Sequence, residues 1–96
     1  MPKDLRAGPA EGRYDYPVEG GVAIADYIRR GDTLLVTHTE VPTALRGGGV
    51  GAKLVKALLD DVRAQGLKVV PLCSFVAAYI RRHPEMRDLL ADEAEG

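Results

Sequence analysis

The stretch Arg46-Gly47-Gly48-Gly49-Val50-Gly51-Ala52 decides how this chain folds, because the sequence changes its pattern there. The residues before it are β-branched and apolar, and the apolar residues after it recur with helical spacing. A strand, a glycine-rich turn and a helix N-terminus together form an anion site, since unpaired N–H groups and the positive end of the helix dipole point outward. Three consecutive glycines cost backbone entropy that an ordinary turn avoids. Two interpretations stay open: a phosphate-binding loop, or a flexible connector that permits a sharp reversal.

The residues before the glycine stretch predict an antiparallel meander. Tyrosines alternate with charged residues over 13–18, which is typical of a half-exposed strand. A second strand is expected over 22–29, and a third, β-branched and apolar, over 33–41. The turns Glu19-Gly20-Gly21 and Gly31-Asp32 are short, and such connections imply antiparallel pairing.

The residues after the glycine stretch predict a helix, a strand and a second helix. Gly66 is a typical helix stop, and the charged residues before it lie mostly off the apolar face. The nearly all-apolar segment 68–72 predicts a short strand buried on both faces, often in parallel pairing. Ser74 is the expected N-cap of a helix that ends near Arg82, ahead of Pro84. The apolar face of the first helix comprises Val50, Leu54, Val55, Leu58 and Val62.

Together these elements predict an α+β fold, in which an antiparallel meander is followed by a β-α-β crossover and a C-terminal helix on one mixed sheet. We expect a single domain over residues 12–91, with a last turn near 86–90. A flexible lead-in over 1–11 is expected before the domain, and an acidic tail over 92–96 is expected after it.

The composition argues against several classes of protein. With 96 residues, the chain is too short for two ordinary domains. Its 13 basic and 14 acidic residues give a formal net charge of −1, so charge provides no case for a nucleic-acid or membrane-surface partner. The single cysteine, Cys73, excludes an internal disulfide framework and a cysteine-rich zinc site, and we expect no metal. Residues 1–12 hold no apolar run and the longest apolar stretch, 69–80, is too short to span a bilayer, so we expect a soluble cytoplasmic protein without a signal peptide.

Two standard phosphate-binding motifs do not match the glycine stretch. The P-loop needs a glycine before its lysine and Ser or Thr after it, whereas Ala52 precedes Lys53 and Leu54 follows. The Rossmann spacing is met only loosely, and the acidic residue that it needs after the next strand is replaced by Leu72-Cys73.

A third pattern, Arg46-x-x-Gly49-x-Gly51, resembles the pyrophosphate loop of the GNAT acetyltransferase superfamily. The surrounding blocks are similar to the small YjdJ-type branch of that superfamily, over about residues 12–90. In order, the blocks are Thr37-His38-Thr39-Glu40-Val41-Pro42, the glycine turn, Val70-Pro71-Leu72-Cys73 with Phe75-Val76-Ala77-Ala78-Tyr79-Ile80, and His83-Pro84-Glu85.

This resemblance implies a minimal GNAT-like fold and acetyl-CoA as the cosubstrate. In GNAT folds the strand before the loop splays away from the next parallel strand, and acyl-CoA lies between them. Here the splayed strand would end near Val41, and Arg46 would add a charge-assisted contact to the pyrophosphate. The resemblance places the pyrophosphate on the backbone amides of Gly47, Gly48, Gly49, Val50, Gly51 and Ala52.

The resemblance also places Cys73 beside the expected thioester and at a helix N-terminus, a setting that lowers a thiol pKa. A thiolate there would accept the acyl group by transthioesterification. The alternatives are direct transfer to the acceptor, as in most of the superfamily, and a role for Cys73 as a small buried hydrophobic residue.

His38 and Glu40 share one face of the expected strand, so either is a candidate general base for an acceptor amine. Glu40 is the better candidate, and we expect His38 to be buried and hydrogen-bonded. Tyr79 lies near the position of a tyrosine that protonates the leaving thiolate in many GNAT enzymes, but one residue early, and core packing is its alternative role. For the basic group 81–83 we expect a solvated helix end, with contact to the adenosine phosphates as the alternative.

The sequence departs from larger GNAT domains, which carry two helices between their first two strands where this chain has only Gly20-Gly21. Those helices help to form the acceptor pocket, so the resemblance implies the donor and leaves the acceptor open. We expect an N-acetyltransferase with an unidentified amine or protein acceptor, as a monomer or weak homodimer. The alternatives are a non-catalytic CoA-binding module, self-acetylated on Cys73, and an interaction module that has lost the ligand.

Overall fold

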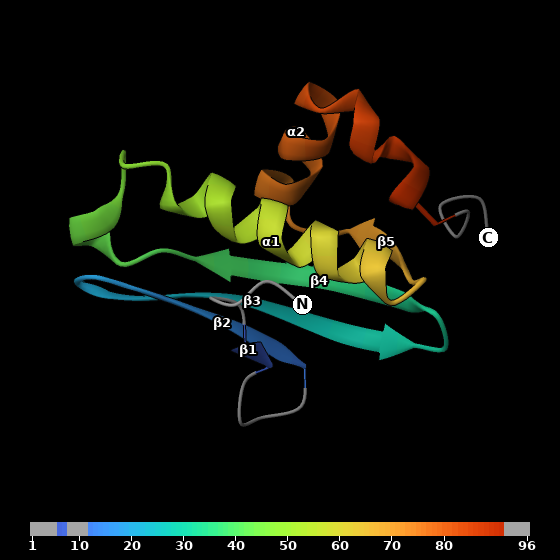
Figure 1. Ribbon diagram of the computed structural model, residues 1–96, viewed down its shortest axis with the longest axis horizontal. Helices are drawn as coiled ribbons and strands as arrows, with labels where there is room; N and C mark the ends of the chain where they lie inside the picture. The colour runs from blue at the N-terminus through green and yellow to red at the C-terminus, as the bar shows by residue number, and fades with distance from the viewer. Residues whose placement is uncertain (1–5, 8–11, 92–96) are drawn as a thin grey trace.

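A mixed sheet organises the computed structural model, which describes residues 6–7 and 12–91 (Figure 1). The strands β1 to β5 are adjacent in chain order; the pairs β1–β2, β2–β3 and β3–β4 are antiparallel, and the pair β4–β5 is parallel. This confirms the predicted α+β meander followed by a β-α-β crossover. The strands are β1 (Arg6–Ala7), β2 (Arg13–Val18), β3 (Gly21–Arg30), β4 (Thr33–Glu40) and β5 (Lys68–Pro71). The helices are α1 (Val50–Ala64) and α2 (Ser74–Arg82), with 3-10 segments η1 (Thr43–Leu45) and η2 (Pro84–Leu89).

The two ends of the sheet differ from the sequence prediction. The short strand β1 lies within the expected lead-in and was not predicted; it pairs with Tyr14 and Asp15 of β2. The other residues of the lead-in, and the expected tail over 92–96, lie outside the described residues. Strand β5 was expected to be buried on both faces, but only Val69 in it is fully buried. The reason is its place at the edge of the sheet, where a single bridge from Val69 to Leu90 is its only further pairing in the described part of the chain.

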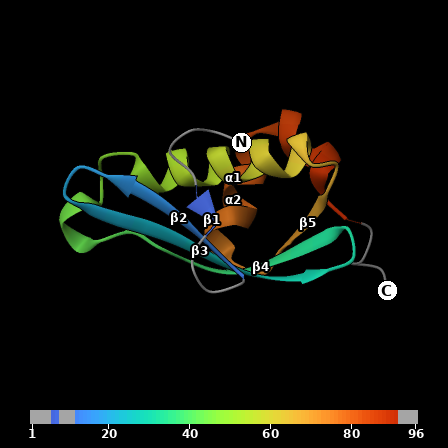
Figure 2. The same cartoon turned by 60° about the horizontal axis from the view of Figure 1, so that its bottom comes forward.

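The core lies between the sheet and α1, which runs along the length of the sheet (Figures 1 and 2). The predicted apolar face of α1 is confirmed, because Leu54, Val55, Leu58 and Val62 are fully buried, and Val50 packs against the core. Removing one such leucine side chain would cost about 2–5 kcal/mol of stability. The other elements contribute Ala23, Ala25, Leu34 and Val36 from the sheet, Val76 and Ile80 from α2, and Met86 and Leu89 from η2.

One charged residue of α1 is an exception to the expected exposed placement. Asp61 is only 1% exposed, and its Oδ2 accepts hydrogen bonds from Tyr14 Oη at 2.8 Å and Gln65 Nε2 at 2.7 Å. These donors offset the cost of burying the carboxylate. Burial and then the hydrogen bond to Asp61 raise the pKa of Tyr14 far above its usual range, so the phenol stays a donor. The contact fixes the C-terminal half of α1 to β2.

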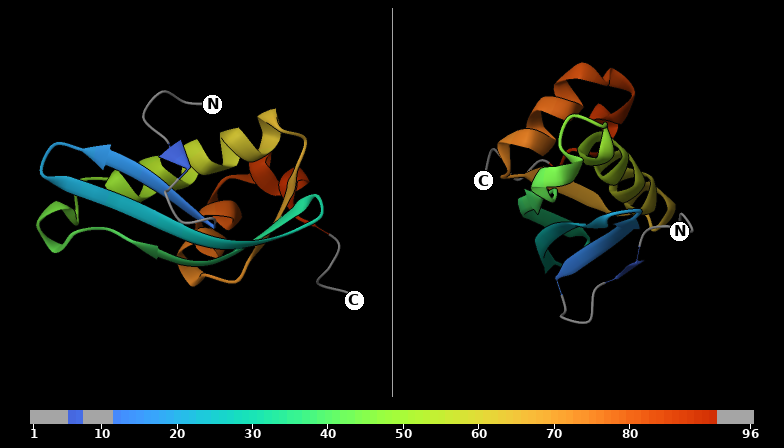
Figure 3. Two further views of the ribbon diagram at one scale, coloured as in Figure 1. Left: turned by 90° about the horizontal axis from the view of Figure 1, so that it is seen from below. Right: turned by 90° about the vertical axis from the view of Figure 1, so that its left-hand side faces the viewer.

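The β2–β3 hairpin tip packs against η1, the segment that leads into the glycine stretch (Figure 3). A Cβ at Gly21 would lie 3.0 Å from Pro42 Cγ, and one at Gly20 would lie 3.2 Å from Leu45 Cδ2. Gly20 also has a φ of +97°, a conformation that favours glycine. The two glycines therefore allow the hairpin tip to support η1 at close range.

Helix α2 begins one residue away from the predicted cap. Its N-cap is Cys73, with no capping hydrogen bond from the side chain, and Ser74 is the first helical residue. The helix ends at Arg82 ahead of Pro84, as predicted. No helix in the described ranges combines the length and apolar character needed to cross a membrane.

We expect Tyr14→Phe to lower the free energy of unfolding by about 1–3 kcal/mol, because the buried Asp61 carboxylate loses a donor. Urea unfolding followed by circular dichroism would measure this. Tyr16→Phe is the matched control, since Tyr16 lies on the same strand and its hydroxyl makes no side-chain hydrogen bond to the described residues. Equal effects of the two substitutions would show that the Tyr14–Asp61 contact is unimportant for stability.

Candidate functional site

Strand β4 contains an extra residue at the point where its pairing with β5 ends. Tyr27 pairs with Val36 and Asp26 pairs with His38, so Thr37 is an additional residue that forms a β-bulge. Pairing between β4 and β5 ends at the same point, with Val36 opposite Pro71. The N–H of Cys73 donates to Val36 O at 3.0 Å, and beyond it the β5 side of β4 has no strand partner among the described residues.

The bulge also decides which side chains of β4 face the core. Val36 faces the core, and after the extra residue the same side is taken by Thr39, which pairs with the buried Ala25. His38 and Glu40 therefore lie on the opposite face, with His38 Nε2 at 3.7 Å from Glu40 Oε1. The prediction that they share a face is confirmed. The expected burial of His38 is wrong, because its side chain is 58% exposed and that of Glu40 is 62% exposed.

A cavity of about 640 Å³ lies where β4 leaves β5, between the start of α1 and one face of α2. Four parts of the chain form its wall, and the glycine turn is one of them. They are the end of β4 (His38, Thr39, Glu40, Val41), the loop before α1 (Leu45, Arg46, Gly47, Gly49), the first turn of α1 (Val50, Gly51, Ala52) and α2 (Phe75, Ala78, Tyr79, Arg82).

The glycine turn presents free backbone donors to this cavity. Gly49 is the N-cap of α1, and the first helical hydrogen bond runs from Lys53 N to Gly49 O at 3.1 Å. The N–H groups over 50–52 consequently have no hydrogen-bond acceptor among the described residues, as is usual for a first turn. Gly47 and Gly49 have φ values of +88° and +82°, and a Cβ at either would meet nothing within 4 Å. An anion can thus approach the turn without steric obstruction.

Gly51 has a different role, which is to allow close packing. A Cβ there would lie 2.8 Å from Phe75 Cζ and 3.5 Å from Val41 Cγ2. The Phe75 ring therefore rests against the first turn of α1 and joins the starts of the two helices. Arg46, on the other side of the turn, donates from Nε to Val41 O at 3.4 Å.

Cys73 lies behind the cavity wall and is absent from its lining. Its Sγ is 3.5 Å from Thr39 Oγ1, and Thr39 does line the cavity. Burial alone would raise the pKa of the Cys73 thiol, but hydrogen bonding from Thr39 and from the amides of Val76 and Phe75 outweighs it, so the pKa is lowered. The thiol is thus one side chain away from the cavity, and its hydrogen-bond donors lower its pKa.

The structure brings most of the predicted site residues together. All of the predicted binding residues except Gly48 line the cavity, as do His38, Glu40 and Tyr79. Sequence reasoning missed Thr39, Leu45, Phe75 and Ala78. One signal was present, because Phe75, Ala78, Tyr79 and Arg82 follow the spacing i, i+3, i+4, i+7 of a single helical face.

The arrangement separates two kinds of chemistry within one cavity. Free amides and the Arg46 guanidinium lie at the α1 end, where they favour an anion. A carboxylate and an imidazole, Glu40 and His38, lie at the β4 end, where they can accept a proton. Within residues 6–7 and 12–91, no group of three or more His, Cys, Asp or Glu side chains is placed to hold a metal ion.

We expect the Cys73 thiol to react with iodoacetamide with a pH midpoint below that of an ordinary thiol, because its pKa is lowered. Thr39→Val removes the hydroxyl donor and should move the midpoint upward. Thr37→Val is the matched control on the same strand, since Thr37 Oγ1 donates to Asp26 O and not to the thiol. A midpoint that Thr39→Val leaves unchanged would contradict the assignment of this donor.

Comparison with known proteins agrees with this geometry. The family model described as GCN5-related N-acetyl-transferase matches residues 13–89. The chain is 35% identical over 63 residues to "Protein NATD1" of Xenopus tropicalis, covering 66% of this chain and 57% of that protein. It is 43% identical over 47 residues to the human protein of the same name, covering 49% of this chain and 42% of that protein. The chain thus matches about half the length of these relatives.

A solved structure shows the same fold over nearly the whole chain. The NMR solution structure of a GCN5-like candidate N-acetyltransferase from Staphylococcus aureus superimposes with a TM-score of 0.69 and 25% sequence identity. The superposition covers 93% of this chain and 90% of that one. With the cavity, the glycine turn and the split between β4 and β5 in place, the match over residues 13–89 shows that the chain belongs to the GCN5-related N-acetyltransferase family.

Proposed function

We propose that this protein is an acetyl-CoA-dependent N-acetyltransferase that acts on an amine acceptor. The observation that carries the proposal is a single cavity that joins the free amides of the α1 N-terminus to the unpaired edge of β4. Family membership supports the reaction class, and the cavity supports a donor that is extended and carries phosphates.

The residues present fit the phosphate end of the donor. The N–H groups over 50–52 can donate hydrogen bonds to an anion, and the open approach at Gly47 and Gly49 admits a group as bulky as a pyrophosphate. The β4 edge beyond Val36 offers backbone groups to the amides of a pantetheine arm. The thioester would then lie deeper in the cavity, near Thr39.

The transfer step needs a neutral amine. Glu40, assisted by His38, would take the proton of an ammonium acceptor, directly or through a water molecule. The amine nitrogen then attacks the thioester carbonyl carbon and forms the amide bond while the C–S bond breaks. The proton that the nitrogen loses passes to the departing CoA thiolate, which leaves as the thiol. Glu40 and His38 lie on an exposed face of the sheet that an acceptor can reach. Proton removal from the amine and its attack on the thioester would therefore occur at the β4 end of the cavity.

A two-step covalent route through Cys73 is the alternative to direct transfer. Its thiolate would attack the thioester, release CoA and form an S-acetyl group that the amine accepts in a second step. The lowered pKa of the thiol supports this route. Its place behind Thr39 supports direct transfer instead, because the thiol does not line the cavity.

A second candidate function is a non-catalytic acyl-CoA-binding module. The β2–β3 connection favours it, since Gly20 and Gly21 join the strands directly and provide no acceptor pocket there. Such a module would bind the donor in the same cavity without turnover.

We expect Gly49→Asp to weaken acetyl-CoA binding at least about tenfold in a calorimetric titration, because the new carboxylate would oppose the pyrophosphate. Gly31→Asp is the matched control. Gly31 also has a positive φ, +57°, and open space around its Cβ position, but it lies in the β3–β4 turn away from the cavity. Saturable wild-type binding that both substitutions leave unchanged would contradict the assignment of the glycine turn.

Turnover with a panel of amines distinguishes the functions and the routes. For an acetyltransferase with direct transfer, Glu40→Gln should lower kcat/KM about 10²- to 10⁴-fold, whereas Cys73→Ala should retain most of the activity. Asp32→Asn, in the distant β3–β4 turn, is the control. Activity lost with Cys73→Ala and an acetylated Cys73 peptide in mass spectra would favour the covalent route. Acetyl-CoA binding without turnover of any amine would favour the binding module.

A further inference from the structure

Two guanidinium groups line the cavity, and they differ in their surroundings. Arg46 directly precedes Gly47 and is hydrogen-bonded to Val41 O. Arg82 comes from α2 and has neither an ion pair nor a side-chain hydrogen bond within the described residues. Arg82 is therefore a cation on the cavity wall without a protein partner in that part of the chain.

Arg82 is also the only member of its basic group that reaches the cavity. Its neighbour Arg81 does not line the cavity. The ring of His83 stacks on Tyr79 with 4.0 Å between ring centroids, and its Nδ1 is 3.2 Å from Glu85 Oε2. We expected 81–83 to form a solvated helix end. Arg81 and His83 do lie outside the cavity, whereas Arg82 lines it.

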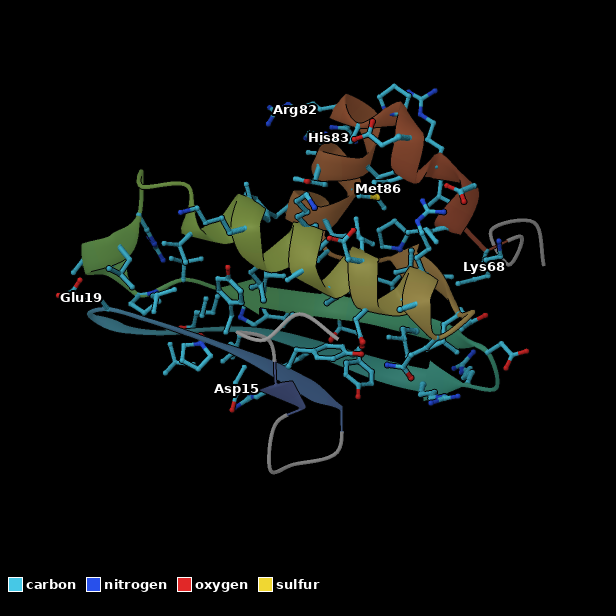
Figure 4. All side chains as sticks on the ribbon, viewed as in Figure 1. Asp15, Glu19, Lys68, Arg82, His83 and Met86 are labelled. Atoms are coloured by element: carbon cyan, nitrogen blue, oxygen red, sulfur yellow. The ribbon has the colours of Figure 1, made fainter. Side chains whose placement is uncertain are left out.

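The α2 residues that line the cavity are spread along the helix, from its first turn to its last. Phe75 rests against Gly51 at the start of the helix, and Arg82 lies two turns later, about 10 Å farther along the axis. Figure 4 shows the Arg82 side chain leaving the outer end of α2 toward the side of the molecule that holds the glycine turn. The acidic member of the lining, Glu40, belongs to β4, so no carboxylate of the lining comes from α2 or the glycine turn.

We propose that Arg82 binds the 3′-phosphate on the ribose of CoA and thereby makes the cavity selective for CoA over 3′-dephospho-CoA. This inference rests on the proposed function. The pyrophosphate is assigned to the free amides and Arg46, which adjoin the glycine turn, whereas the 3′-phosphate is a separate group at the nucleotide end of the molecule. A phosphomonoester carries about −1.5 to −2 charges at neutral pH, and a guanidinium can bind it with two parallel hydrogen bonds.

The test compares two ligands on three proteins by isothermal titration calorimetry. The ligands are CoA and 3′-dephospho-CoA, which differ only in the phosphomonoester. The proteins are the wild type, Arg82→Gln and Arg81→Gln; the last makes the same charge change one residue away, outside the cavity. Because Arg81 and Arg82 are both exposed, the two variants should fold, and circular dichroism would check this.

We expect the wild type to bind CoA about tenfold more tightly than 3′-dephospho-CoA. Arg82→Gln should weaken CoA binding by the same factor and leave 3′-dephospho-CoA binding unchanged, and Arg81→Gln should preserve the wild-type preference. If Arg82→Gln weakened the binding of both ligands equally, the inference would be overturned, because Arg82 would then contact a chemical group that the two ligands share. A wild type that binds both ligands equally would also overturn it but leave the proposed function standing, whereas a wild type that binds neither would contradict both.

Discussion

The functional half of this fold depends on one extra residue in β4. Thr37 shifts the register with β3 at the point where pairing with β5 ends, and beyond that point β4 continues without a parallel partner among the described residues. Strand β5 itself ends at Pro71, and Cys73 is already the N-cap of α2. The same residue changes which side chains face inward: Thr39 lies on the core side of β4 and Glu40 on the opposite, exposed face, and both line the cavity.

Packing around the glycine turn holds the other side of the cavity in place. The hairpin tip at Gly20 and Gly21 supports η1 from one side, and Phe75 rests against Gly51 from the other. Between these contacts, Gly47 and Gly49 remain open. The turn therefore combines close packing beneath it with free amides above it, which is what binding a phosphate group with backbone atoms requires.

The sequence predicted the elements well, because each has a clear period and a clear stop. The apolar spacing of α1, the glycine that ends it and the short turns of the meander are local signals. The bulge has no such signal, since nothing in Thr37-His38 distinguishes it from a regular strand, and the exposure of His38 was predicted wrongly as a result. The burial of Asp61 was missed for a similar reason: its partner Tyr14 is 47 residues away in the chain. The place of Cys73 behind Thr39 is also a long-range contact, which residue types at one position cannot reveal.

A backbone amide NMR titration with acetyl-CoA tests the central claim, that the split between β4 and β5 and the glycine turn form one donor site. The account predicts saturable shifts in three segments, 37–41, 47–52 and 73–82, which share one dissociation constant. The amides of the β3–β4 turn at 31–32 should stay unchanged. Shifts confined to the glycine turn, with 37–41 unaffected, would contradict the account, because the ligand would then bind as a phosphate alone and not enter the split.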